Sequence, residues 1–507
     1  MKKGLSILLV LCIVLSVFVL PAGPMVTVVS ADAATAASDS ATWPTDYLCK
    51  MPSTAKNRGL KVLLPRELHT TEQRLITEFK QKTGCKVDVT VTTEASYVTK
   101  LVSMIAQNNA PDVCVLQMDN FPAIVTNALQ PLNRDLFRLD DVYWYKPYMD
   151  AFSVNGQYFS VAMQGSWNCE DGNYVAYYQP KVLRECGVTT EPYELYQDGR
   201  WNWETQYQIA STVKAAGKGY YGMMLQSADL LMLSAGQDFV SYDGKQFANA
   251  LSAITKSSLL TKSWQETCRL NENGLLRMWN LSQVQQGKVG LFTAKVYGMY
   301  NESSWCFADL PGGGQSIEAV PVAGPKGATA YTPISPKTWG VAKTASNPEG
   351  AAYFLRYFLD PDNYDMDTTF VNSQFQKVYQ IITDSSATKQ IRYGSGVLNH
   401  VQDENYESLC DSISTTPATS VTTVLQSKRS FVENAVKKVN DDLSRLPSCS
   451  HLYDNACDSD CNLCGAGRTV YGHRYSATCD ETCNSCGYTR IASHTYKTTK
   501  FKLLLSK

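Results

Sequence analysis

The sequence predicts an α/β fold that opens with a parallel β-sheet. Five segments near the start of the folded chain alternate between strand and helix patterns: Leu60–Leu64, Thr70–Thr83, Lys86–Thr92, Tyr97–Asn108 and Asp112–Leu116. The first and last are short apolar runs, the third alternates apolar and polar residues, and the other two carry apolar residues at helical spacing. Strands separated by helices at this spacing pair in parallel, because each helix returns the chain to the same end of the sheet.

Length and composition limit the class of protein. The chain has 507 residues, of which 44% are hydrophobic and 18% charged, so we expect two or three globular domains. Lys and Arg together number 46 and Asp and Glu 47, which gives a net charge of −1. Because proteins that bind polyanions carry a large basic excess, the composition predicts no nucleic-acid partner.

The N-terminal segment is an expected signal peptide, residues 1–33. Two lysines precede the apolar run Leu5–Leu20, and Ala31–Ala33 offers a cleavage site. An uncleaved membrane anchor is the alternative, because the apolar run is almost long enough to span a bilayer. Residues 34–58 are rich in Ala, Ser and Thr and predict a linker.

Polar residues follow two strands of the expected sheet. Open parallel sheets bind ligands beyond the carboxyl ends of their strands. That rule selects Arg66 and Glu67 after the first strand, and Gln117, Asp119 and Asn120 after the third. Asp119 and Asn120 have an alternative role as caps of the helix that follows them, since Asp and Asn are good N-caps.

A series of motifs along the chain resembles extracellular solute-binding proteins of the carbohydrate-uptake type. In the first part of the chain the matching motifs are Phe79–Gly84, Tyr97–Leu101, Ala110–Val113, Leu129–Leu132 and Asn155–Val161. Further along they are Tyr177–Leu183, Trp201–Glu204, Gln286–Leu291 and Trp339–Glu349. Each motif is weak by itself, but their order and spacing are specific, and together they cover residues 59–446.

The resemblance implies a two-lobed, periplasmic-binding-protein-like (Venus-flytrap) α/β fold with hinge crossings. The first lobe would comprise residues 59–165 and 318–382, and the second residues 166–317 and 383–446. Such proteins close on a solute, here most simply a sugar or oligosaccharide, and deliver it to the membrane subunits of an ABC importer. The importer subunits would be other chains.

The resemblance also implies solute contacts. By position in the family pattern, Asp119 and Asn120 are polar contacts, and Tyr297 is an aromatic that stacks on the solute in the second lobe. Sugars suit such a site, because they present hydroxyl edges to polar groups and C–H faces to aromatic rings. Further candidates near the crossings are Trp167, Glu170 and Trp339.

Catalytic motifs are absent from the sequence. It has no GxSxG, no phosphate-binding loop and no HExxH, and only two histidines, His69 and His400, precede residue 450. We therefore expect a protein that is not an enzyme. Two alternatives stay open: a secreted carbohydrate-active hydrolase with two carboxylates, which need no fixed spacing, and a surface adhesion or scaffold protein.

Residues 447–496 form a tandem repeat rich in cysteine and histidine, followed by a tail at 497–507. The spacing Cys-x3-Cys-x2-Cys at Cys457, Cys461 and Cys464 recurs 22 positions later at Cys479, Cys483 and Cys486. Units this short have too little apolar core to fold alone, so we expect metal ions or disulfide bonds to stabilise them.

Three cysteines and one histidine per unit predict a tetrahedral site, with one zinc ion in each repeat. The favoured sets are Cys457, Cys461 and Cys464 with His473, and Cys479, Cys483 and Cys486 with His494. A competing register uses His451 and His473, and three disulfides are the alternative that secretion permits. The nine other cysteines of the mature chain have no pattern and suggest small buried hydrophobic residues.

The expected setting follows from these features. The repeat unit resembles Cys/His-rich repeats appended to secreted proteins of anaerobic, Gram-positive bacteria, and this resemblance implies a secreted or cell-surface protein of a Gram-positive bacterium. We also expect a monomer that binds a small-molecule solute. The two-lobed body needs no cofactor.

Overall fold

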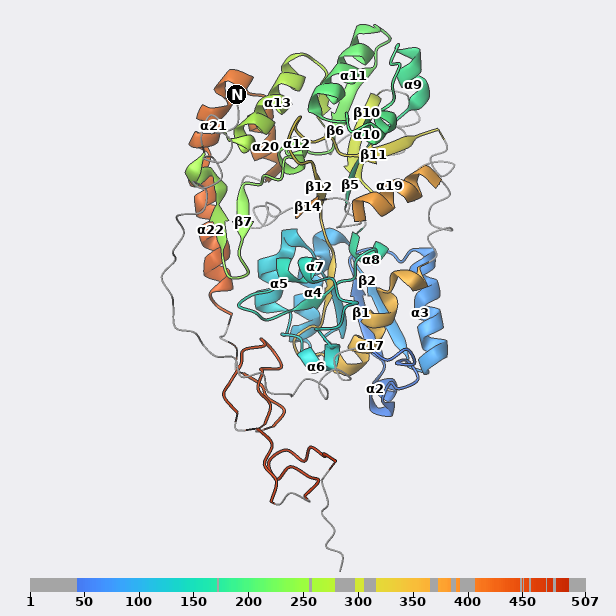
Figure 1. Ribbon diagram of the computed structural model, residues 1–507, viewed down its shortest axis with the longest axis vertical. Coiled ribbons are helices and arrows are strands. Elements are labelled where there is room, and N and C mark those ends of the chain that lie inside the picture. Colours follow the sequence, from blue (N-terminus) through green and yellow to red (C-terminus); the bar gives the residue numbers. More distant parts are fainter. Residues whose placement is uncertain are drawn as a thin grey trace, which may run out of the picture. The chain divides into compact units, whose positions relative to one another are not determined.

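The computed structural model describes residues 43–170, 173–254, 258–278, 297–304, 316–364, 373–383, 389–392, 406–446, 449, 451–455, 457–470, 472–476 and 480–491 (Figure 1). The expected signal peptide and the tail at 497–507 lie outside these residues. Among the helices in the described ranges, none is both long enough and apolar enough to cross a membrane.

The first sheet has five strands in the order β2-β1-β3-β13-β4. They are β1 (Leu60–Leu64), β2 (Val87–Val91), β3 (Val113–Leu116), β4 (Ser160–Val161) and β13 (Thr338–Gly340). β1 pairs in parallel with both β2 and β3, while β13 runs antiparallel to β3 and β4. The three strands predicted at the start of the folded chain, and their parallel pairing, are confirmed.

Two helices, α3 (Thr70–Thr83) and α4 (Glu94–Ala106), connect these parallel strands. At the start of α3 the Glu72 carboxylate accepts a hydrogen bond from the His69 backbone N–H at 2.8 Å, which satisfies a donor that the helix leaves free. The helix ends at Gly84, whose φ of 73° is the left-handed conformation that glycine adopts without strain. Both helices lie close to their predicted bounds.

The second sheet also has five strands, in the order β11-β5-β10-β6-β9. They are β5 (Tyr174–Tyr178), β6 (Tyr221–Leu225), β9 (Leu276–Met278), β10 (Tyr297–Ser303) and β11 (Glu318–Pro321). β6 pairs in parallel with β9 and β10, whereas β5 runs antiparallel to β10 and β11. Side chains such as Leu183, Val213 and Met299 build a separate apolar core on this sheet. The chain thus has the predicted pair of α/β sheets.

The remaining helices surround the two sheets. Those nearest in sequence to the strands of the first sheet are α2 (Ser53–Arg58), α5 (Phe121–Asn127), α6 (Arg134–Phe137), α7 (Lys146–Ala151) and α17 (Pro348–Phe358). The short α8 (Trp167–Glu170) precedes β5. The others are α9 (Pro180–Glu185), α10 (Pro192–Gln197), α11 (Trp203–Ala215), α12 (Leu230–Ser234), α13 (Leu259–Glu272), α19 (Ser373–Thr383), α20 (Tyr406–Ser414), α21 (Val421–Ser427) and α22 (Arg429–Leu443).

Two small sheets complete the fold. β12 (Tyr331–Ile334) pairs in parallel with β14 (Lys389–Arg392), and β7 (Val240–Tyr242) forms a hairpin with β8 (Phe247–Asn249). The hairpin is fixed to α22 by the Asn440 side chain, which accepts from the Phe247 N–H at 2.8 Å and donates to the Phe247 carbonyl at 2.9 Å. A half-buried amide that satisfies both backbone groups of one residue holds helix and strand in a single register.

One segment pairs differently from the expected lobe boundaries. Residues 318–382 were assigned to the first lobe, but β11 hydrogen-bonds to β5 of the second sheet. α19 packs against β11, and Phe375 meets Tyr177 edge-on with ring centroids 5.9 Å apart. From this segment the first sheet receives β13. The motif at Trp339 marks where the chain re-enters the first sheet, whereas nothing in the pattern of β11 specifies its partner strand.

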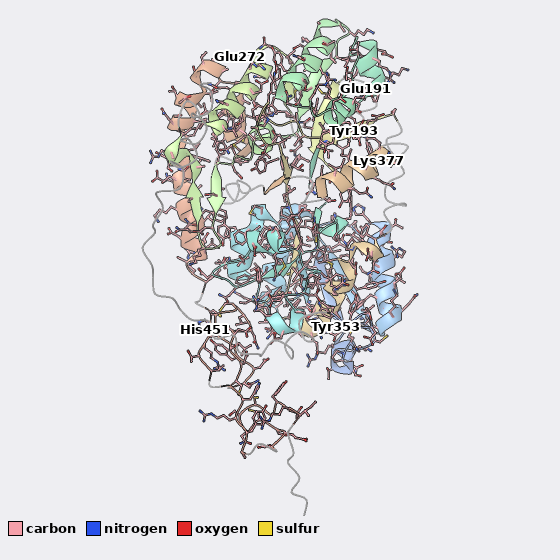
Figure 2. The ribbon with its side chains drawn as sticks, in the orientation of Figure 1. Glu191, Tyr193, Glu272, Tyr353, Lys377 and His451 are labelled. Atoms are coloured by element: carbon pink, nitrogen blue, oxygen red, sulfur yellow. The ribbon has the colours of Figure 1, made fainter. Side chains whose placement is uncertain are left out.

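The second half of the expected linker is folded. Trp43, Tyr47 and Met51 are buried, and α2 follows them. The rings of Trp43 and Tyr47 pack against Tyr353 of α17, with centroids 5.1 and 6.4 Å away. Tyr353 is labelled in Figure 2. The Trp43 backbone N–H donates to the Asp141 carboxylate at 2.5 Å. The Ala-, Ser- and Thr-rich composition belongs to residues 34–42, outside the described ranges, and the aromatic anchors begin at Trp43.

We expect Trp43→Ala to lower the free energy of unfolding by about 3 kcal/mol, because a buried indole is lost and a cavity remains. Lys50→Ala removes an exposed side chain of the same segment and should change the free energy by less than about 0.5 kcal/mol. Chemical denaturation of both variants measures the difference. Equally small effects would mean that residues 43–58 act as a tether after all.

Candidate functional site

The carboxyl edge of the first sheet gathers the polar residues chosen from the sequence. β1 lies directly beside β3 in parallel, so both strands end at the same edge. Arg66 and Glu67 follow β1, and Gln117 follows β3. The structure therefore brings together two segments that are about fifty residues apart in the sequence, as the parallel arrangement requires.

Arg66 holds the loop after β1 against α3. Its guanidinium donates to both carboxylate oxygens of Glu72 at 2.9 Å and also to the Glu67 carbonyl at 2.9 Å. The Glu72 side chain is only 1% exposed, so this fork-shaped pair neutralises a buried charge. The side chain of Glu67 is exposed beside it. The geometry gives Arg66 a structural role in addition to any contact with a solute.

The turn after β3 gives the Asn120 side chain a partner in the backbone. Residues Met118–Asn120 form a short 3₁₀ helix, η1. Asn120 is buried, and its side-chain oxygen accepts from the Gln117 backbone N–H at 3.0 Å. This bond closes the turn. Asn120 stands directly before α5 (Phe121–Asn127), but its side chain makes no capping bond to that helix, so the expected cap is not formed by this side chain. Gln117 is half-buried, and for Asp119 the structure describes the backbone in η1 and not the side chain.

The aromatic candidates of the crossings lie in the interior. Trp167 is 3% exposed and packs against Tyr379 with ring centroids 5.7 Å apart. Trp339 is 2% exposed and meets Phe358 edge-on at 5.3 Å. Glu170 belongs to α8, and its side chain is not among those described. The burial of both indoles assigns them to packing in this conformation.

The carboxyl edge of the second sheet carries different residues from those expected. Tyr297 opens β10 opposite Tyr221, at the amino end of the parallel strands β6 and β10. Its backbone is therefore at the opposite edge from the one where parallel strands bind ligands. At the carboxyl end, Gln226 follows β6, its N–H donates to the Asn301 carbonyl at 3.0 Å, and its side chain accepts from the Tyr174 hydroxyl at 3.2 Å.

Tyr174 and Gln226 are thus candidates that the sequence analysis missed. The signal was present, because the same carboxyl-end rule, applied to the strand 221–225, selects Gln226. The family pattern, in contrast, transfers a residue type to a position without specifying which end of a strand that position occupies.

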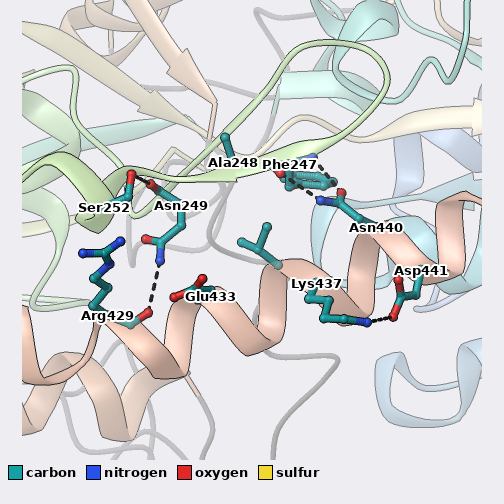
Figure 3. Close-up of a pocket in the computed structure, with 10 residues that line it drawn as sticks. Phe247, Ala248, Asn249, Ser252, Arg429, Glu433, Lys437, Asn440 and Asp441 are labelled. Carbon is teal, nitrogen blue, oxygen red and sulfur yellow. Dashed lines mark hydrogen bonds and ion pairs between the residues drawn. The ribbon is translucent and has the colours of Figure 1, made fainter.

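A separate groove of about 460 Å³ lies between β8 and α22 (Figure 3). Within its wall Lys437 forms an ion pair with Asp441 at 2.5 Å. None of the residues predicted to contact a solute is in its lining. Those that line it are Phe247, Ala248, Asn249, Ser252, Arg429, Glu433, Val436, Lys437, Asn440 and Asp441.

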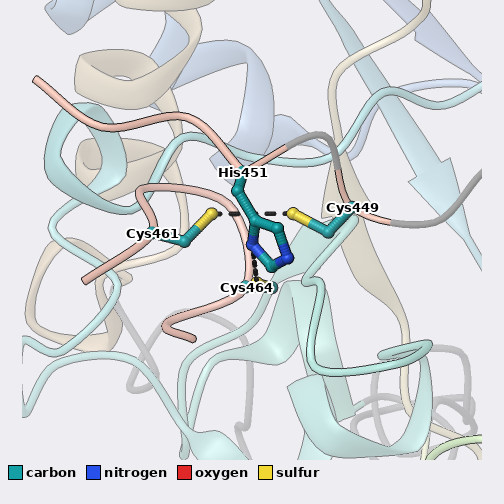
Figure 4. A group of neighbouring side chains, drawn as sticks. All are labelled: Cys449, His451, Cys461 and Cys464. Atoms are coloured by element: carbon teal, nitrogen blue, oxygen red, sulfur yellow. Dashed lines mark hydrogen bonds between the residues drawn. The ribbon is translucent and has the colours of Figure 1, made fainter. Parts of the chain in front are cut away.

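Two groups of three cysteines and one histidine occur in the C-terminal module. The first group is Cys449, His451, Cys461 and Cys464, whose side chains point toward one another (Figure 4). The second group is Cys457, His473, Cys483 and Cys486. In each group the four potential ligand atoms all lie within 4.8 Å of one another, so each could hold a metal ion.

The membership of these groups differs from the sets expected from the repeat. The histidines are those of the competing register, His451 and His473. Cys449, which was counted with the unpatterned cysteines, joins Cys461 and Cys464, while Cys457 moves to the second group. The expected ligands Cys479 and His494 lie outside the described residues. The pair Cys449-Ser-His451 was the sequence signal for this arrangement.

The spacing of the ligand atoms matches a tetrahedral metal site. With metal–sulfur bonds of about 2.3 Å and metal–nitrogen bonds of about 2.05 Å, a tetrahedron has S–S edges of about 3.8 Å and S–N edges of about 3.5 Å. The Sγ atoms of Cys449 and Cys461 are 3.6 Å apart, and those of Cys457 and Cys483 are 3.9 Å apart. A disulfide would bring either pair to about 2.05 Å.

The sulfur-to-nitrogen distances agree with the same geometry. His451 Nδ1 is 3.5 Å from Cys464 Sγ, and His473 Nδ1 is 3.2 Å from Cys486 Sγ. Both groups therefore present three thiols and the Nδ1 of one imidazole, a closed set of four ligands.

The backbone around each group prepares one cysteine to be a thiolate. Burial alone would raise the pKa of Cys461, but N–H donors of Cys464 and Leu463 and the His451 ring outweigh it and lower the pKa to about 6. The corresponding contacts lower the pKa of Cys483 to about 6. Thiolates are the form that binds metal, so the fold favours ligation at neutral pH.

Comparison with known proteins gives one family and one fold. A model of the family described as bacterial extracellular solute-binding protein matches residues 74–379, more than half of the chain. No curated protein matches the chain. One similar solved structure is the GacH receptor of Streptomyces glaucescens, described in complex with acarbose, at 13% identity and a TM-score of 0.55 over 76% of this chain and 98% of that one.

Two further structures are similar. The galacto-N-biose/lacto-N-biose I-binding protein of Bifidobacterium longum has 12% identity and a TM-score of 0.54, over 75% of this chain and 97% of that one. The sugar-binding protein MalE of Xanthomonas citri has 14% identity and a TM-score of 0.53, over 76% and 98%. At these identities the likeness shows the fold.

We expect Arg66→Ala to lower the free energy of unfolding by about 2 kcal/mol, because the buried Glu72 carboxylate loses two charged donors and keeps only the His69 N–H. Glu67→Ala is the matched control, since its side chain is exposed, and should be nearly neutral. Denaturant titration of the two variants compares them. A neutral Arg66→Ala would mean that the ion pair does not hold the loop.

Proposed function

The chain belongs to the bacterial extracellular solute-binding protein family, and we propose that it captures a sugar or oligosaccharide and delivers it to the membrane subunits of an ABC importer. The observation that carries the proposal is the extent of the family match. Residues 74–379 run from α3 on the first sheet to α19 beside the second, and so include most strands of both. The match therefore extends over strands of both sheets.

Capture would use the carboxyl edges of both sheets. Each edge supplies half of a site, and the two halves contact one solute together only when the lobes close. A solute that touches both halves shifts the hinge equilibrium by the difference in its affinity for the closed and open states. The polar groups proposed for this contact are Gln117 and Asp119 on the first sheet, and Gln226 with the Tyr174 hydroxyl on the second.

A sugar is the solute class that these groups favour. Amide, carboxylate and phenol groups form hydrogen bonds with hydroxyl groups in a fixed orientation, and a tyrosine ring can also pack on a C–H face. The similar proteins whose descriptions name acarbose and lacto-N-biose support this choice. We propose that the protein binds its solute without turnover, acts outside the cell as a monomer, and belongs to a Gram-positive bacterium.

For the C-terminal module we propose that each Cys3His group holds one zinc ion. Thiolate and imidazole ligands in a tetrahedron suit zinc, which brings no redox chemistry. In the described part of the module the buried residues are Cys461, Asn462 and Cys483, so there is no apolar core to support the fold. A bound ion would supply that free energy, and binding and folding would be one event.

A panel of oligosaccharides, peptides and polyamines should contain a sugar that raises the melting temperature of the full chain. A ligand at 100 times its dissociation constant adds about 2.7 kcal/mol to stability, which thermal unfolding detects. The same sugar should change tryptophan emission and be recovered unchanged.

Each other outcome would count against the proposal. Products of hydrolysis would identify an enzyme, and binding to a polymer without any shift in melting would identify an adhesion protein. A shift caused only by peptides or polyamines would overturn the sugar assignment while leaving solute capture in place.

We expect Gln226→Ala and Asp119→Ala each to weaken binding of that sugar by about 1.5–3 kcal/mol, because a hydrogen bond at a dry site is lost. Tyr297→Ala should leave the affinity nearly unchanged, since its backbone lies at the other edge of the sheet. Calorimetric titration compares the three variants. The reverse order, with Tyr297→Ala the most damaging, would restore the stacking role that the family pattern implies.

A further inference from the structure

The two Cys3His groups do not follow the boundary between the sequence repeats. The first group takes its ligands from residues 449–464, and the second from residues 457–486. The two stretches overlap, because Cys457 precedes the Cys461-x2-Cys464 turn and yet lies 3.9 Å from Cys483, which is 26 residues further along the chain. One repeat therefore completes the ligand set of the next.

The two cysteine turns themselves are equivalent. The Leu463 N–H points to Cys461 Sγ at 3.4 Å, and the Ser485 N–H points to Cys483 Sγ at the same distance. Gly465 and Gly487, with φ of 70° and 73°, end the two turns. Each turn provides two ligands in the same geometry, so the difference between the groups lies in the other two ligands.

The network around the turns also recurs 22 residues apart. Arg468 donates from Nε to the Asp458 carbonyl at 2.8 Å and lies 3.8 Å from the Tyr453 ring centroid. Arg490 donates in the same way to the Asp480 carbonyl at 3.1 Å and lies 3.6 Å from the Tyr475 ring centroid. This scaffold orients both groups alike and gives no reason for a difference in their composition.

The difference arises where the repeat is imperfect. In the first group the cysteine two residues before the histidine, Cys449, is the remaining ligand. The residue at the equivalent position before His473 is Tyr471, which has no thiol. The second group thus has no thiol at this position, and among the described residues its fourth member is Cys457.

We propose that the module is an interlocked pair of zinc sites, in which Cys457 of the first repeat is a ligand of the second ion. This inference rests on the proposed metal binding and adds which ion each cysteine and histidine binds. The second ion then joins the two repeats directly, and the first Cys-x2-Cys turn lies within the loop that this ion closes between Cys457 and His473. The two repeats then fold as one unit and not as two independent units.

The competing hypothesis is that each repeat holds its own ion, which puts Cys457 in the same site as Cys461. Paired substitutions separate the two, because two changes in one site cost one ion, while changes in different sites cost both. Cys479 is the matched comparison for Cys457, since it occupies the equivalent position of the second repeat. It lies outside the described residues.

The experiment measures zinc per full-length chain, purified under reducing conditions and dialysed, with the thermal unfolding of the two-lobed body as a check on folding. We expect two equivalents for the native chain and for Cys479→Ser. Cys449→Ser, Cys457→Ser and the double variant Cys457→Ser/Cys483→Ser should each retain one equivalent. Cys457→Ser/Cys461→Ser should retain none. Cobalt substitution, in which the absorption depends on the number of thiolates, reports the same counts independently.

Three results would overturn the inference. If Cys457→Ser/Cys461→Ser keeps one ion and Cys457→Ser/Cys483→Ser keeps none, each repeat holds its own ion. If Cys479→Ser loses an ion, the control position is a ligand. If the native chain binds no zinc and its module cysteines resist alkylation until reduced, the module is disulfide-bonded, and the proposed metal binding fails together with the interlock. Solute binding by the body is a separate measurement and is unaffected by any of these results.

Discussion

The parallel pairing of β1 with both β2 and β3 is the constraint on which the body of the protein depends. It brings the carboxyl ends of strands far apart in the sequence to one edge, and so places Arg66 next to the turn that carries Gln117. Hydrogen bonds and an ion pair within the protein fix the loops at the carboxyl edge of the first sheet. The fork between Arg66 and Glu72 fixes one loop, and the Asn120 side chain closes the other. A site built from such loops is preorganised, because the free energy of ordering them is supplied by folding and not by the solute.

The parts of this arrangement that depend on local pattern were predictable from the sequence. Helical spacing and a terminal glycine gave α3 to its last residue, and alternation gave β2. The choice of Gln117 and Arg66 needed only the direction of the strands. What could not be predicted depends on partners remote in the sequence. Nothing in residues 318–321 indicates that β11 pairs with β5, and nothing in the composition of the expected linker indicates that Trp43 reaches Tyr353.

The candidate site shows the same division. The roles of Asp119 and Asn120 were indistinguishable as neighbouring polar residues, and the geometry of one turn gives Asn120 a backbone partner. The resemblance implies a stacking role for Tyr297, whereas the pairing of β10 with β6 puts its backbone at the amino edge of these strands. The period of 22 residues in the module is visible in the sequence. The period shows which positions of the two repeats are equivalent, but it does not show which ion each cysteine would bind. The two repeats differ at one position that matters for the ligands: Tyr471 stands where the first repeat has Cys449.

The body and the module solve the problem of stability, and of thiol chemistry, in different ways. Cysteines of the body such as Cys114 and Cys268 are buried, and burial raises the pKa of both thiols, that of Cys268 to about 12, so they remain protonated and unreactive. In the described part of the module the buried residues are Cys461, Asn462 and Cys483, and hydrogen bonds lower the pKa of the two cysteines to about 6. Thiolates of that kind are readily oxidised unless they are coordinated. Ligation by zinc would therefore both fold the module and protect its thiolates outside the cell, and a ligand set that spans two repeats would couple both effects along its length.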